Sequence, residues 1–122
     1  MYLVGAAHPR KVDAQRIVEA LIAERRRLVS DVEVLQEILH RYASIDRREM
    51  IQLAFDALLG VVDEVFPIQM SSIDRAKGIV LARRKLSARD ALHLAVMEEQ
   101  GVKEILTFDA GFDGYPGIKR IA

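Results

Sequence analysis

Hydrophobic residues recur three and four positions apart in five stretches of the chain, with polar residues between them. This spacing places the apolar side chains on one face of an α-helix, so it predicts five amphipathic helices. Four of the stretches begin with a residue that favours a helix N-cap. The helices are expected over residues 13–26, 30–42, 46–60, 71–81 and 87–100, with caps at Ser30, Asp46, Ser71 and Ser87.

Shorter apolar runs lie between and after these helices and predict strands over residues 28–29, 61–68, 104–107 and 118–121. Pro67 lies near the end of the second run, and proline favours an edge position in a sheet. Strands that are separated by helices pair in parallel through right-handed crossovers. The sequence therefore predicts an α/β fold, a three-layer α/β/α domain with a mostly parallel central sheet.

Composition limits the class of protein. A chain of 122 residues with 51% hydrophobic and 30% charged residues suits one compact domain. No apolar run approaches the ~18 residues that a membrane span requires. The chain has no cysteine, which excludes disulfides and thiolate zinc sites. We expect a cytoplasmic protein with no membrane partner.

Charge argues against strong non-specific binding to nucleic acid, because 18 basic and 18 acidic residues cancel. Basic residues still cluster locally at 25–27, 47–48 and 83–85. Such clusters are either ordinary solvated surface or local contacts for phosphate groups.

Acidic residues in the C-terminal third are candidates for a metal site. Asp109 follows the predicted strand that ends at Thr107, and Asp90 lies in the first turn of the preceding helix. Ligands bind at the carboxyl ends of parallel strands, and carboxylates without cysteine partners suit Mg²⁺ or Mn²⁺. The residue pattern also allows Asp90 as a helix-capping residue, and Asp109 and Asp113 as loop residues bonded to local backbone.

Two further residues have simpler interpretations from the pattern. Glu37 falls on the side of its helix away from the apolar residues, which is typical of solvated surface. His93 lies one turn beyond Asp90, where it could touch a substrate, but the pattern favours a histidine on the helix surface.

Three segments, in this order, resemble motifs of PIN-domain ribonuclease toxins of the VapBC toxin–antitoxin type. They are DVEVLQEIL at 31–39, SARDALHLA at 87–95 and LTFDAGFD at 106–113. The resemblance implies an endoribonuclease that depends on Mg²⁺ or Mn²⁺, is silenced by an antitoxin and forms a homodimer. It also implies that Glu37, Asp90 and Asp109 are catalytic metal ligands, with Asp113 as an auxiliary ligand or a structural residue.

The N-terminus departs from the family pattern. PIN domains open with a central strand that ends in Asp, whereas residues 1–9, MYLVGAAHP, resemble the stretch after that strand. We therefore expect residues 1–122 to form an N-terminally incomplete PIN domain without the first acid, either shortened or degenerate. The central position of the sheet would be missing, filled by Met1–Val4, or filled by a strand from a partner chain. Without the first acid, nuclease activity should be strongly reduced compared with that of a chain that has the opening strand.

Partners follow from the same resemblance. The RNA phosphates would contact Arg89, beside Asp90, and the preceding loop residues Arg83, Arg84 and Lys85. An amphipathic antitoxin segment would dock on the helices near Val34–Tyr42 and Met50–Leu59, which have enough apolar surface.

Two other classes of protein compete with the nuclease. The missing first Asp favours a PIN-like interaction module that binds a partner without cutting RNA. A receiver-like or flavodoxin-like domain would need an acidic pair after its first strand, and no such pair is found. There is also no glycine-rich phosphate loop.

Overall fold

The computed structural model describes residues 1–4, 11–107 and 110–121. The helices are α1 (Lys11–Ala23), α2 (Val32–Ser44), α3 (Ile51–Val61), α4 (Met70–Ala82) and α5 (Ala88–Gln100). The strands are β1 (Tyr2–Leu3), β2 (Val29–Asp31), β3 (Glu64–Phe66), β4 (Glu104–Leu106) and β5 (Lys119–Ile121). Short 3₁₀ helices cover Arg48–Met50 (η1) and Ala110–Phe112 (η2).

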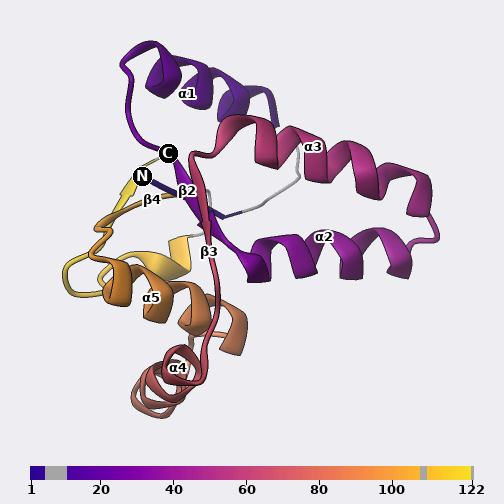
Figure 1. The fold of residues 1–122 in the computed structure, drawn as a ribbon. Coiled ribbons are helices and arrows are strands. Elements are labelled where there is room, and N and C mark those ends of the chain that lie inside the picture. Colours follow the sequence, from indigo (N-terminus) through magenta and orange to yellow (C-terminus); the bar gives the residue numbers. More distant parts are fainter. Residues whose placement is uncertain (5–10, 108–109, 122) are drawn as a thin grey trace.

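The five strands form one sheet in the order β3-β2-β1-β4-β5, and every neighbouring pair is parallel. Helices cover both faces of the sheet (Figure 1). The predicted α/β fold is therefore confirmed. The expectation that the strand before Pro67 lies at an edge is also confirmed, since β3 is the outermost strand on its side.

Strand β1 occupies the middle of the sheet. Tyr2 pairs with Val29 of β2 on one side and with Ile105 of β4 on the other. Of the alternatives expected for this position, recruitment of Met1–Val4 as a short strand is the one that the structure shows. The backbone groups of β2 and β4 thereby gain partners that they would otherwise lack.

Two hydrophobic cores lie on opposite faces of the sheet. Tyr2 and Ile105 belong to the core that packs against α4 and α5. Leu3 and Leu106, the next residue in each strand, belong to the core that includes Leu21 of α1. This division follows from the alternation of side chains along a strand. Figure 1 shows the two helix layers, with α4 and α5 on one side of the strands and α1 and α3 on the other.

The cap of α5 agrees with the sequence prediction. The Ser87 hydroxyl accepts a hydrogen bond of 3.1 Å from the Asp90 backbone N–H. The helix ends at Gly101, whose φ of 69° is the left-handed conformation that glycine adopts without strain. No helix in the described part of the chain is long and apolar enough to cross a membrane.

The other three predicted caps were wrong. Ser30 belongs to β2, and its hydroxyl donates to the Leu3 carbonyl across the sheet, so Asp31 becomes the N-cap of α2. Asp46 has a φ of 55° and lies in the turn before η1 instead of capping a helix. Gln69 takes the cap position of α4, while the predicted cap Ser71 donates to Glu99. The two serine hydroxyls bond to distant parts of the chain, Ser30 to β1 and Ser71 to α5, which local sequence does not reveal.

Candidate active site at the carboxyl ends of the strands

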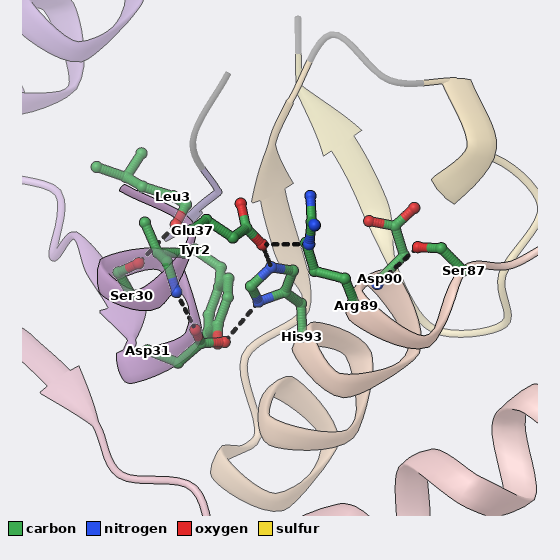
Figure 2. A network of polar contacts seen from close by, with 10 residues as sticks. Tyr2, Leu3, Ser30, Asp31, Glu37, Ser87, Arg89, Asp90 and His93 are labelled. Atoms are coloured by element: carbon green, nitrogen blue, oxygen red, sulfur yellow. Dashed lines mark hydrogen bonds and ion pairs between the residues drawn. The ribbon is translucent and has the colours of Figure 1, made fainter. Parts of the chain in front are cut away.

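The candidate site lies where β2 ends and α2 begins, next to the first half of α5. Asp31 is the last residue of β2 and also caps α2, because its Oδ1 accepts a hydrogen bond of 3.1 Å from the Val34 N–H. Glu37 lies on α2, and His93 and Arg89 lie on α5 (Figure 2). The fold thus brings together side chains that are more than fifty residues apart in the sequence.

His93 is at the centre of this site. Its Nδ1 lies 2.7 Å from Asp31 Oδ2, and its Nε2 lies 2.9 Å from Glu37 Oε1. The side chain is only 2% exposed. The interpretation of His93 as a surface histidine was therefore wrong. The signal that could have found it is the run of residues 91–97, ALHLAVM, because a helix that is apolar all round is buried.

Protonation of His93 follows from its surroundings. Burial of the ring lowers the pKa of His93, but the hydrogen bonds and negative charges of Asp31 and Glu37 raise it further, to about 9. The ring is then an imidazolium at neutral pH, with each nitrogen donating to a carboxylate. Tyr2 also donates its hydroxyl hydrogen to Asp31, and burial together with the charge of that carboxylate raises the pKa of Tyr2.

Glu37 is less exposed than the residue pattern indicated. Its side chain is 17% exposed, and besides His93 it has Arg89 as a neighbour, with Arg89 Nε 3.4 Å from Glu37 Oε1. In the view of Figure 2, Arg89 lies between the carboxylates of Glu37 and Asp90. An acid of α2 therefore pairs with a cation of α5 at this edge of the sheet.

The structure describes two of the three other predicted acids, Asp90 and Asp113. Asp90 is half-buried in the first turn of α5. Asp113 is exposed and accepts two hydrogen bonds from Arg120, at 2.7 and 3.1 Å, which lower the pKa of its carboxyl group. Asp109 lies outside the described residues.

Glu37 and Asp90 offer carboxylate oxygens, which are suitable ligands for a hard divalent cation. Among residues 1–4, 11–107 and 110–121, however, no three histidine or acidic side chains form a group that could hold a metal ion. A complete ligand set therefore requires a further residue, for which Asp109 is the candidate.

The predicted RNA contacts Arg83, Arg84, Lys85 and Arg89 are all exposed. The Arg83 guanidinium stacks on the ring of Tyr115 with its carbon 4.7 Å from the ring centroid. Arg89, by contrast, is directed to Glu37. The basic residues therefore begin beside the acidic site and extend along the loop before α5.

Comparisons with known proteins identify the family. The PIN domain model matches residues 1–118. The chain is 57% identical over its whole length to Ribonuclease VapC13 of Mycobacterium tuberculosis, and covers 93% of that protein.

Solved structures show the same fold. The crystal structure of M. tuberculosis VapC20, described as a sarcin-ricin loop cleaving toxin, superposes with a TM-score of 0.74 at 21% identity, over 96% of this chain and 97% of that one. A toxin-antitoxin complex from Klebsiella pneumoniae gives a TM-score of 0.63 at 14% identity, over 97% and 94%. The chain therefore belongs to the PIN-domain family and, within it, to the VapC proteins.

Proposed function

We propose that this protein is an endoribonuclease toxin that depends on Mg²⁺ or Mn²⁺ and hydrolyses RNA phosphodiester bonds. The observation that supports this most is the meeting of Glu37 from α2 with the first turn of α5, which includes Asp90, at the carboxyl ends of the strands. Relationship over the full length to a protein named as a ribonuclease supports the same activity.

The residues that would hold the cation are Glu37, Asp90 and Asp109, with Asp113 as an auxiliary group. When bound, the cation would supply an activated water and neutralise charge on the phosphate. Arg83, Arg84 and Lys85 would bind RNA phosphates and orient the backbone toward this edge of the sheet. Arg89, which is half exposed beside Glu37, would contact an RNA phosphate next to the cation.

We also propose an antitoxin as a partner, bound through helices α2 and α3. These helices and Ile45, the C-cap residue of α2, expose large apolar side chains that the domain itself does not cover; the helical ones are Val32, Leu39, Leu53 and Leu59. An amphipathic segment could bury them in its apolar face. Protection of the α2 and α3 amides from hydrogen exchange on antitoxin addition would test this contact.

An interaction module without nuclease activity is the second candidate. It is favoured by the pairing of Glu37 with His93 and Arg89, which already occupies this proposed ligand. Such a protein would bind the antitoxin but would neither bind Mn²⁺ nor cleave RNA.

Replacing Asp90 by Asn tests the metal site. We expect Mn²⁺ affinity, measured by titration calorimetry, to fall at least tenfold and RNA cleavage to fall with it, because a ligand charge is lost. The Asp90 backbone N–H would still donate to Ser87, so the helix should remain. Asp74→Asn, at an exposed acid on α4, is the control. Unchanged Mn²⁺ affinity in Asp90→Asn would limit Asp90 to a structural role, and no binding by the wild-type chain would favour the interaction module.

A further inference from the structure

His93 connects a carboxylate in the core with a carboxylate at the edge of the sheet. One ring nitrogen contacts Asp31 at 2.7 Å and the other contacts Glu37 at 2.9 Å. Both partners are acceptors only, so both ring nitrogens donate. Figure 2 shows the three side chains in sequence, with the ring between the two acids.

Asp31 is a fixed point for this connection. Its carboxylate is fully buried and is held by hydrogen bonds to both oxygens. Oδ1 accepts from the Val34 N–H, and Oδ2 accepts from Tyr2 and from His93. Because β1, β2 and α2 all contribute to holding Asp31, the orientation of the His93 ring is set by the sheet itself.

Glu37 is the end of the connection that lies nearer the surface. A glutamate side chain on a helix surface has several rotamers, and ordering it costs up to about 2 kcal/mol of conformational entropy. The hydrogen bond from His93 selects one of them, whereas the other neighbour, Arg89, is half exposed and long. His93 also lies three residues after Asp90 on the same helix, so one turn of α5 contains a proposed ligand and the residue that fixes the other.

We propose that Asp31 and His93 are positioning residues that hold the Glu37 carboxylate in the orientation needed at the active site. Asp31, the N-cap residue of α2, orients the His93 ring, and the ring in turn orients Glu37, a proposed metal ligand. Neither residue touches substrate. The value of this arrangement for metal binding rests on the proposed function, whereas the orientation of Glu37 can be tested without metal.

Two substitutions of His93 each keep one of its two side-chain hydrogen bonds and remove the other. In His93→Gln the amide nitrogen replaces Nε2 and can donate to Glu37, but the bond to Asp31 is lost. In His93→Asn the amide nitrogen replaces Nδ1 and can donate to Asp31, but the bond to Glu37 is lost. Each variant loses one buried hydrogen bond and the positive charge of the ring, so thermal melts should show similar destabilisation. His40→Gln, at an exposed histidine on α2, is the control.

The first measurement is made on metal-free protein, by the ¹³C resonance of the Glu37 carboxyl carbon. We expect His93→Asn to move it toward the position of a solvated glutamate, and His93→Gln to leave it close to wild type. Equal shifts in both variants, or no shift in either, would overturn the proposal, because His93 would then be only a core residue.

The second measurement is Mn²⁺ affinity. Loss of a supporting hydrogen bond to a ligand typically weakens metal binding 10–100-fold. We expect that loss in His93→Asn and a smaller loss, within several-fold, in His93→Gln. Equal weakening of the two variants would contradict a positioning role in metal binding. If the wild-type chain bound no Mn²⁺, the proposed metal site would be wrong, and the carboxyl resonance alone would decide whether His93 orients Glu37.

Discussion

Asp31 is the single residue on which most of the candidate site depends. Its carboxylate is fully buried, caps α2 and accepts hydrogen bonds from Tyr2 and His93. Charged groups are rarely buried unless they are paired in this way. Asp31 therefore combines a local role, ending a strand and starting a helix, with a tertiary role between three elements.

Replacing Asp31 by Ala should cost about 3 kcal/mol or more of unfolding free energy, because it leaves a buried imidazolium without one partner and removes a helix cap. Urea unfolding would measure the loss. Asp74→Ala, at an exposed acid, should change stability by no more than about 0.5 kcal/mol. Equal small losses in both variants would mean that Asp31 is not paired as the structure has it.

Single residues also show where reasoning from sequence reaches its limit. The Ser87–Asp90 contact was predictable because both partners lie within one helical turn. The apolar run around His93 indicates its burial, but its two partners could not be predicted, because they lie 62 and 56 residues away in the sequence. The proposed roles of Glu37, Asp90 and Asp109 as metal ligands came from family resemblance, and they remain predictions.

At the scale of elements, α5 has the start and the end that the sequence predicts. A serine cap begins it and a left-handed glycine ends it. By contrast, the start of α2 moves one residue from Ser30 to Asp31, because the Ser30 hydroxyl bonds to the neighbouring strand. Helix boundaries are therefore predictable where they depend on local partners alone.

Two glycines offer a matched test of helix chemistry. Gly101→Ala should destabilise the protein by about 1 kcal/mol, since alanine is strained at a φ of 69°. Gly78→Ala, inside α4 with nothing within 4 Å of the added carbon, should stabilise it by about 0.5–1 kcal/mol. Thermal melts should therefore move in opposite directions. If both melting temperatures moved in the same direction, either the left-handed conformation of Gly101 or the helical conformation of Gly78 would be wrong.

At the scale of the whole molecule, the sheet joins the two cores. Neighbouring residues of β1 and of β4 point to opposite faces, so neither core can be lost without disturbing the strand that supports the other. We therefore expect the domain to unfold as one cooperative unit.

Ile105→Ala and Leu106→Ala test this cooperativity. Each removes a buried side chain from a different core and should cost about 2–5 kcal/mol. In each variant, far-ultraviolet circular dichroism and tyrosine fluorescence should report one shared transition. Leu81→Ala, at a side chain 76% exposed, should be nearly neutral. Separate transitions by the two probes would show that the cores unfold independently.

The sequence by itself determined the class of fold, the approximate extent of the helices and strands, and the edge position of the strand before Pro67. These features depend on local periodicity, turn chemistry and the geometry of parallel crossovers. Only the tertiary structure decided which short segment fills the middle of the sheet, which residue caps α2, and that His93 is buried between Asp31 and Glu37. Those outcomes depend on hydrogen-bond partners and packing surfaces from distant parts of the chain, which exist only once the strands have paired.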